Sequence, residues 1–321
     1  MNTNYQKYEY ALSKTVKIKL TEAGIIDHKE EIRLEPCHTI MIGQDWYSHY
    51  YVHCRIKKRK YFLKALKPND GLMHCNNSLR TLKTNSGCLD YPEVLVHPFD
   101  FGAVQYFITS FIDARNLDEL IGQIPISEWE SIGDKIYLRL QEIEQLHAEQ
   151  YSDQGKFIST PCDILFIEKL RRRFSHRVAQ TLPKDLVERI CDECASVLLN
   201  SIYSSPTLLH MDIKPANVLY NPQSRKVYLI DFEFARFGDL DYGWTQILLS
   251  GLNAFNPIYK KHIYPNIVKH RTDLTTALQS SKMRCYILYQ TLCNMIYYSD
   301  HGLPCPQELE KLFYNIFEQF T

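Results

Sequence analysis

Three oxygen-bearing side chains in one short stretch have the types and spacing needed to hold a divalent cation. Asp212 and Asn217 lie five positions apart, and Asp231 follows fourteen positions after Asn217. Mg²⁺ binds carboxylate and amide oxygens and bridges phosphate oxygens. Two of these side chains would hold the ion, the remaining Asp would take the proton of an attacking hydroxyl, and Lys214 would add a positive charge beside the transferred group. The stretch therefore predicts metal-assisted phosphoryl transfer.

The elements around these residues must direct them toward one place. Three runs rich in Val, Leu, Ile and Tyr surround the stretch and read as strands: Thr207–His210, Asn217–Tyr220 and Lys226–Ile230. The turn-forming run Asn221–Ser224 joins the last two into a hairpin. Asp212 then lies on the loop that enters the hairpin, and Asp231 ends its returning strand. We expect Asp212, Asn217 and Asp231 to point toward a common centre.

The chain before residue 110 has the pattern of an antiparallel sheet with one helix. Six short runs of Val, Ile, Tyr and Phe alternate with turn-forming residues: Glu31–Leu34, His38–Ile42, His49–Arg55, Tyr61–Leu66, Glu93–Val96 and Gln105–Thr109. A helical candidate near Leu72–Lys83 interrupts them.

After Asn116 the apolar spacing becomes helical. Ser127 and Glu130 form a predicted capping box, which opens a helix with one apolar stripe at Trp129, Ile132, Ile136, Leu140 and Ile143. A second long helix is predicted over Lys184–Ile202, directly after Pro183. The further helical segments are residues 273–298, which are mostly helical, and a C-terminal helix with a stripe of Leu309, Leu312, Phe313, Ile316 and Phe317.

Composition excludes several classes of protein. Hydrophobic residues make up 45% of the 321 residues and charged residues 23%, which is typical of a globular protein. Lys plus Arg and Asp plus Glu stand at 37 each, so the chain lacks the basic excess of a nucleic-acid-binding protein. No segment has the ~20 apolar residues needed to cross a membrane, and residues 1–20 have no apolar signal core. With ten scattered cysteines, these features predict a reduced, cytoplasmic protein.

The run HMDIKPAN, residues 210–217, resembles the catalytic loop of the protein-kinase-like superfamily, and Asp231-Phe232-Glu233 resembles its metal-binding tripeptide. The continuation through Phe234-Ala235 and Gly238-Asp239-Leu240-Asp241 is similar to the aminoglycoside phosphotransferase and choline kinase family. Members of that family phosphorylate a hydroxyl on a small molecule. The resemblance implies that Asp212 is the base and that Asn217 and Asp231 hold Mg²⁺.

The same resemblance implies a two-lobed α+β fold. Residues 1–110 would form an antiparallel N-lobe that grips the nucleotide, and residues 111–321 a mainly helical C-lobe with the catalytic loop and substrate cleft. Lys64 would pair with the phosphates of ATP or GTP, and the backbone from Ser110 to Ile112 would read the adenine. The hairpin around Gly43 would cradle the phosphates, with the Ser48 hydroxyl as one donor.

One feature of that family has no counterpart in the sequence. Its lysine pairs with a Glu on the following helix, but the chain has no Asp or Glu from Leu72 to Leu89. Either this helix falls elsewhere, or Lys64 is held differently, or the grip on phosphate is weaker. The last case would favour a nucleotide-binding or scaffolding protein with little catalysis.

Two details favour a small acceptor over a protein. Glu233 replaces the Gly of protein kinases, and only nine residues separate Asp231 from Asp241, with no Ala-Pro-Glu after them. We therefore predict transfer of the γ-phosphate of ATP or GTP to a hydroxyl of an aminoglycoside-, choline- or sugar-like molecule. Glu233, Asp239 and Asp241 would suit an amine-bearing acceptor, although Asp241 would equally cap the next helix. We expect no nucleic-acid or membrane partner.

Overall fold

The computed structural model describes residues 3–42, 45–66, 91–147, 164–176, 179, 182–201, 206–253, 258–271 and 280–318. The chain divides into two compact units. The first unit comprises Met1–Ala114 and the short segment Ile230–Phe234, and the second comprises Arg115–Leu229 and Ala235–Thr321.

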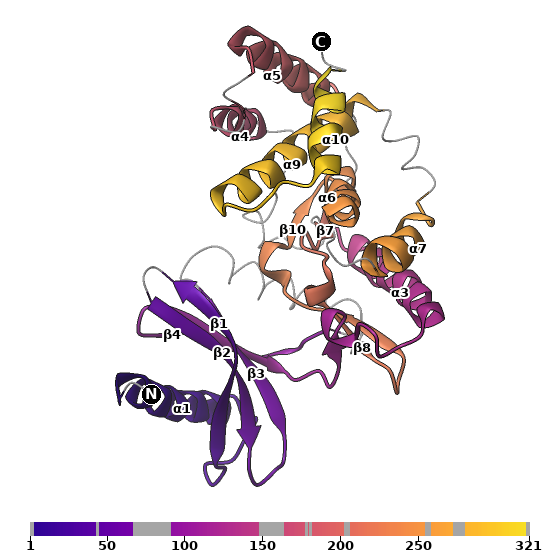
Figure 1. Ribbon diagram of the computed structural model, residues 1–321. Coiled ribbons are helices and arrows are strands. Elements are labelled where there is room, and N and C mark those ends of the chain that lie inside the picture. Colours follow the sequence, from indigo (N-terminus) through magenta and orange to yellow (C-terminus); the bar gives the residue numbers. More distant parts are fainter. Residues whose placement is uncertain are drawn as a thin grey trace. The chain divides into compact units, whose positions relative to one another are not determined.

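The first unit is built on a five-stranded antiparallel sheet in the order β1-β2-β3-β5-β4 (Figure 1). The strands are β1 Ile32–Ile42, β2 Asp45–Cys54, β3 Lys60–Leu66, β4 Val94–Phe101 and β5 Val104–Ser110. This sheet confirms the predicted antiparallel β lobe. The helical candidate at Leu72–Lys83 lies outside the described residues.

Two of the predicted strands are one. Residues 31–34 and 38–42 were expected as separate runs, whereas β1 is continuous along β2 and changes register between Pro36 and His38. Pro36 has no backbone N–H to donate to the ladder, and such a position is tolerated at a bulge. The proline therefore interrupts the register without ending the strand.

A helix that the sequence did not reveal covers one face of this sheet. Helix α1, Thr3–Glu22, buries Leu12, Val16 and Leu20, which recur every four residues (Figure 1). These side chains share a core with sheet residues such as Tyr50 and Leu63. The apolar stripe is short and lies among lysines, so it was read as polar sequence rather than as a helix.

The second unit contains two small sheets. β6 Arg115–Asn116, β8 Val218–Asn221 and β9 Lys226–Leu229 form one in the order β6-β8-β9. β7 Thr207–Leu209 pairs with β10 Arg236–Gly238 in the other. The predicted β8–β9 hairpin is confirmed. β10 was not predicted, because three residues are too few for a periodic pattern.

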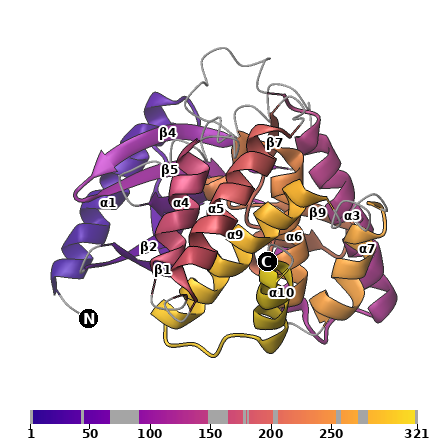
Figure 2. The same ribbon diagram turned by 90° about the horizontal axis from the view of Figure 1, so that it is seen from above.

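Helices make up most of the second unit. They are α3 Ile126–Glu144, α4 Ile164–Phe174, α5 Lys184–Leu199, α6 Leu240–Asn253, α7 Tyr264–Val268, α9 Ser281–Asp300 and α10 Gln307–Glu318, with a π-helical turn at Tyr259–Ile263 before α7. α4, α5 and α9 lie side by side (Figure 2), and α10 packs on α9. The predicted apolar stripe of α3 is fully buried. On α10 four of the five predicted stripe positions are buried, and Leu312 is half-buried.

The predicted capping box of α3 is wrong. Pro125 occupies the position before the helix, and no side chain caps its first turn. Since α3 already begins at Ile126, Ser127 lies inside the first turn, where its hydroxyl is past the capping position.

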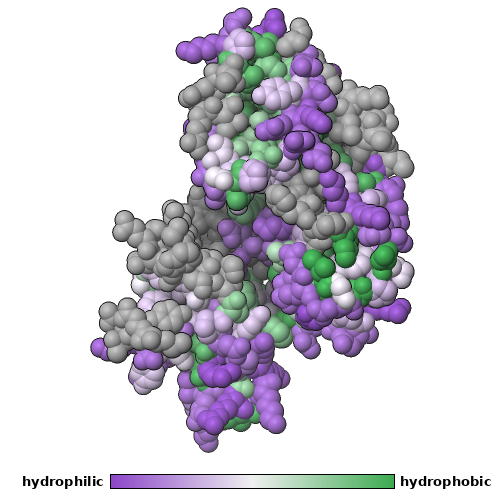
Figure 3. Space-filling model, viewed as in Figure 1, coloured by the Kyte–Doolittle hydropathy of each residue, from purple (hydrophilic) through white to green (hydrophobic). Residues whose placement is uncertain are grey.

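Within the described part of the chain, no helix is long and apolar enough to cross a membrane. On the face drawn in Figure 3, the described surface is largely hydrophilic, with separate hydrophobic islands.

The turn between β2 and β3 generates a stability prediction. Lys58 is exposed there and has a left-handed backbone, with φ of 49°. That conformation costs about 1 kcal/mol for a residue with a Cβ and little for glycine. We expect Lys58→Gly to exceed Lys58→Ala in unfolding free energy by about 1 kcal/mol, measured by urea-induced unfolding. Both variants lose the same charge, so equal stability of the two would contradict the left-handed turn.

Candidate active site

The loop between β7 and β8 holds Asp212 in a network of hydrogen bonds. Lys214 Nζ and Asn217 Nδ2 both donate to Asp212 Oδ2, at 2.8 and 2.7 Å. Asn217 Nδ2 also donates to the Asp212 backbone carbonyl at 3.0 Å. The structure therefore brings three of the predicted site residues together: Asp212, Lys214 and Asn217.

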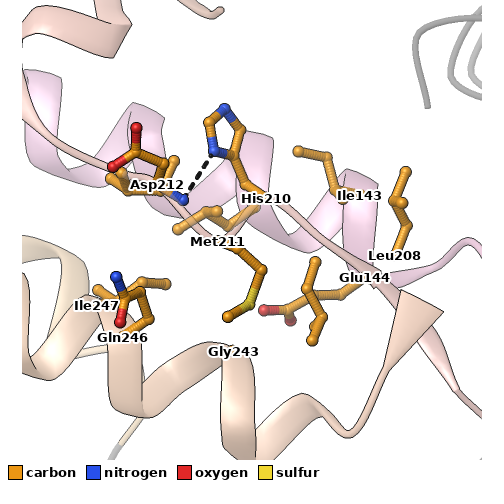
Figure 4. Close-up of a pocket in the computed structure, with 12 residues that line it drawn as sticks. Ile143, Glu144, Leu208, His210, Met211, Asp212, Gly243, Gln246 and Ile247 are labelled. Carbon is orange, nitrogen blue, oxygen red and sulfur yellow. Dashed lines mark hydrogen bonds between the residues drawn. The ribbon is translucent and has the colours of Figure 1, made fainter. Parts of the chain in front are cut away.

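Backbone conformation and a buried histidine fix the direction of Asp212. His210 is 3% exposed, and its Nδ1 accepts the Asp212 backbone N–H at 3.3 Å (Figure 4). Met211, between them, has a left-handed φ of 66°. A residue with a side chain in this conformation is strained, and such strain is held at functional sites by the surrounding structure.

Helices α3 and α6 pack against this loop. Ile143 and Glu144 of α3 and Gly243 and Gln246 of α6 line a small pocket together with Met211 (Figure 4). Gly243 allows this close packing, since a Cβ there would lie 2.8 Å from Leu209 Cδ2, at the end of β7, and the Leu209 side chain would have to shift. The loop thus rests on two helices of its own unit.

The orientation of the Asn217 amide follows from its neighbours. Both Asp212 atoms that it faces are acceptors, so Asn217 must present its nitrogen to them. Its oxygen then lies on the other side of the amide. Asn217 is 5% exposed and is the last residue of a 3₁₀ turn, Pro215–Asn217, which directly precedes β8. An amide oxygen held in one direction suits Mg²⁺, which accepts only near-ideal octahedral geometry.

Asp231 lies in the first unit, in contact with Lys64. Lys64 Nζ donates to Asp231 Oδ1 and lies 3.5 Å from Glu233 Oε2. Asp231 has a left-handed φ of 66° and is followed by a 3₁₀ turn at Phe232–Phe234. Phe232 is fully buried and contacts the Tyr91 ring edge-on, which anchors the segment.

Lys64 shares its sheet face with aromatic side chains that the sequence reasoning missed. Residues alternate between faces along a strand, so Phe62 lies on the Lys64 side and His49 is its neighbour on β2. The Ala65 N–H donates to His49 Nδ1 at 3.1 Å, which places the ring proton on Nε2. The His49 and Phe62 rings are in contact, and Tyr51 contacts both Phe62 and Phe111. Strand periodicity, counted from Lys64, is the signal that would have found this face.

Ser48 and Ser110, which were also predicted to bind the nucleotide, are less available for such contacts. Ser48 is 3% exposed and shares the face of Tyr50 and Val52, which pack in the core with α1. It therefore lies on the opposite face of the sheet from Lys64, and residues 43–44 of the same hairpin are outside the described part. Ser110 exchanges two hydrogen bonds with Glu93, one through its N–H and one through its hydroxyl.

Ile112 follows Phe111 on the segment that leaves β5. Its backbone carbonyl accepts the Ala114 N–H at 2.9 Å.

The acidic residues at the start of α6 are already paired. Asp239 Oδ1 accepts the Asp241 N–H at 3.1 Å, so Asp239 caps α6, and the cap predicted at Asp241 is wrong. Lys282 of α9 lies 3.0 Å from Asp239 Oδ2 and 2.7 Å from Asp241 Oδ2. These carboxylates raise the pKa of the Lys282 ammonium against the opposing effect of its burial.

The two predicted metal ligands lie in different units, and both offer an oxygen donor. Among the described residues, no three His, Cys, Asp or Glu side chains are grouped to hold a metal ion. Asn217 offers an amide oxygen in the second unit, and Asp231 a carboxylate in the first. Both are ligand types that Mg²⁺ takes in proteins, where water and substrate phosphates usually complete its shell.

Comparison with known families gives one match. Residues 84–246, about half of the chain, match the family described as the phosphotransferase enzyme family. The matched region contains Asp212, Asn217 and Asp231 and ends within α6. No curated protein sequence matches the chain.

Solved structures share the fold. APH(2″)-IIIa, in a complex with GDP and kanamycin, is 15% identical, with 96% of this chain and 98% of that chain covered and a TM-score of 0.56. A putative aminoglycoside phosphotransferase from Ralstonia eutropha is 12% identical, with 96% of each chain covered and a TM-score of 0.61. APH(2″)-IIa, in a ternary complex with streptomycin and ATP, is 15% identical over 88% of each chain, with a TM-score of 0.58. These matches confirm the predicted fold class.

The donor role of Asn217 can be tested without any reaction. Asn217→Asp replaces a buried donor by a second carboxylate next to Asp212, and we expect a loss of about 1–3 kcal/mol in unfolding free energy, measured in urea. Asn221→Asp is the matched control, because Asn221 Oδ1 accepts the Ser224 N–H and a carboxylate does the same. We expect that variant to stay within about 0.5 kcal/mol of wild type. Equal losses in the two variants would contradict the network around Asp212.

Proposed function

The chain belongs to the phosphotransferase enzyme family, and we propose that it transfers the γ-phosphate of ATP or GTP to a hydroxyl group of a small molecule. The observation that carries the proposal is the Asp212 carboxylate, whose Oδ2 accepts from both Lys214 and Asn217. Those two donors leave Oδ1 as the oxygen that takes the proton of the attacking hydroxyl. Lys214, which is half exposed, supplies positive charge as the phosphate is transferred.

Asn217 and Asp231 would hold Mg²⁺ on the nucleotide phosphates. The bound ion would neutralise charge that develops on the transferred group. The direction of the Asn217 amide, set by Asp212, keeps its oxygen available for this purpose. Lys64 would contact the phosphates from the sheet of the first unit, as the resemblance implies.

The aromatic face around Lys64 suits the nucleotide base. Phe62 lies two residues before Lys64 on the same face, and Phe111 follows β5. A purine stacks favourably on aromatic rings, with about 1–3 kcal/mol per base. Since the N–H and hydroxyl of Ser110 are engaged by Glu93, Ile112 is the better candidate to read the edge of the base. The opposite face that holds Ser48 argues against a phosphate contact by its hydroxyl.

The short segment after Asp231 favours a small acceptor. Between Asp231 and α6 there is room only for the 3₁₀ turn and the three residues of β10. A protein substrate in extended form needs a longer platform. We therefore propose an aminoglycoside-, choline- or sugar-like acceptor. Aminoglycosides come first in the test, because solved structures of similar fold include complexes with kanamycin and streptomycin.

A scaffold with little catalysis is less well supported. It was motivated by the missing acidic partner of Lys64, and the structure gives Lys64 two acidic partners, Asp231 and Glu233. The direct experiment is a panel of hydroxyl-bearing metabolites and antibiotics with ATP and GTP and Mg²⁺, read by release of nucleoside diphosphate. Release that depends on one acceptor would establish the activity, and release with none would remove it.

The role of Asp212 predicts a separation between turnover and binding. We expect Asp212→Ala to lower kcat by about 10²–10⁴-fold, the usual contribution of a general base. Nucleotide affinity should change by less than about threefold, because the carboxylate acts on the acceptor hydroxyl. Steady-state kinetics and equilibrium binding of ADP measure the two effects.

Asp192→Ala is the matched control, since Asp192 is an exposed aspartate whose partner is Arg171 on the surface. It should leave both quantities unchanged. A loss of nucleotide affinity in Asp212→Ala as large as its loss of kcat would show that Asp212 is not the base.

A further inference from the structure

The ammonium group of Lys64 is almost buried, which sets a requirement for its surroundings. The Lys64 side chain is 10% exposed. A charge removed from water costs several kcal/mol unless opposite charges and hydrogen bonds compensate it. Two carboxylates of one short segment meet this requirement, those of Asp231 and Glu233.

These two carboxylates have different duties in the proposed function. A carboxylate that holds Mg²⁺ has less negative charge to offer a lysine, and Asp231 is the candidate metal ligand. The Glu233 carboxylate lies 3.5 Å from Lys64 Nζ and has no metal ion to hold. Its negative charge therefore stays with Lys64 when Asp231 binds the cation.

The sequence also indicates that the acidic partner of Lys64 must come from elsewhere in the chain. The stretch from Leu72 to Leu89, where the resembled family has the acidic partner of this lysine, contains no Asp or Glu. Glu233 stands where protein kinases have Gly, and Gly has no side chain to offer. The acidic side chain that the stretch Leu72–Leu89 lacks is thus provided by Glu233.

We propose that Glu233 is a positioning residue that holds Lys64 in place of a helix glutamate and so releases Asp231 for the metal ion. This inference rests on the proposed function and deepens it. Its physical basis is competition: with Glu233 neutral, the only one of these two charges left to Lys64 is Asp231, and a cation must break that ion pair before it binds. The rigid anchor for both carboxylates is Phe232, which is buried between them in the chain.

The test is the gain in ADP affinity that Mg²⁺ produces, given by the ratio of dissociation constants in EDTA and in saturating Mg²⁺. We expect Glu233→Gln to reduce this gain about tenfold and to raise the Mg²⁺ concentration for half-maximal kcat by a similar factor. Glu233→Asp, which keeps the charge on a shorter side chain, should lie between Glu233→Gln and wild type. Glu35→Gln is the matched control, because it removes a carboxylate from an exposed ion pair of the same unit; it should change nothing.

A double-mutant cycle distinguishes positioning from direct metal binding. In a Lys64→Met background the Lys64 ammonium group no longer competes for Asp231, so Glu233→Gln should change the Mg²⁺ gain by less than about twofold. An undiminished effect in that background would overturn the proposal and make Glu233 a metal ligand. A wild-type gain in Glu233→Gln would also overturn it.

The binding measurements also separate this inference from the proposed function. Wild-type protein that binds ADP with a Mg²⁺ gain but phosphorylates no acceptor would refute the proposed activity, and the cycle would still report on Lys64 and Glu233. Wild-type protein that binds no ADP would overturn both. Circular dichroism of each variant verifies that a lost gain does not reflect a lost fold.

Discussion

The burial of one ammonium group is the constraint on which the first unit's chemistry depends. Lys64 lies on β3, whose alternate residues Tyr61, Leu63 and Ala65 pack against the core, so the strand cannot move to let the lysine reach water. Carboxylates must therefore come to it. They come from Ile230–Phe234, a segment far away in sequence that is nevertheless part of the same unit. The left-handed backbone of Asp231 is the strained part of that arrangement. The buried ring of Phe232 anchors the segment.

In the second unit the residue held by its neighbours is a carboxylate, that of Asp212, and its two side-chain donors engage only Oδ2. Lys214 and Asn217 share Asp212 Oδ2, and His210 fixes the backbone N–H of the same residue. Removing one donor would leave Asp212 oriented by the others, whereas converting Asn217 to an acceptor would set two carboxylates against each other. Asn217 is therefore the residue of this network whose change to an acidic side chain would disturb it most. The hydrogen bonds that hold its amide to Asp212 also set the direction of the amide oxygen.

The sequence predicted the local contacts around Asp212 better than the long-range ones. Spacing and residue type were sufficient to bring Asp212 and Asn217 together and to predict the β8–β9 hairpin, since these depend on a local turn and short strands. The sequence did not predict the partner of Lys64, because Glu233 and Lys64 are far apart in the chain and only tertiary packing brings them together. Ser48 was assigned from its place in a hairpin, but strand alternation turns it into the core. Helix α1 was missed because its three-residue apolar stripe only becomes meaningful against a sheet.

The paired carboxylates change what the site offers to an acceptor. Glu233 lies with Lys64, and Asp239 and Asp241 lie with Lys282, so each acidic group that would attract an amine already has a lysine near it. Asp239 is further committed to the α6 cap and to the Tyr286 hydroxyl, and it is 5% exposed. The Asp241 carboxylate is more exposed than that of Asp239. If the acceptor carries an amine, its ammonium group must compete with Lys282 for Asp241.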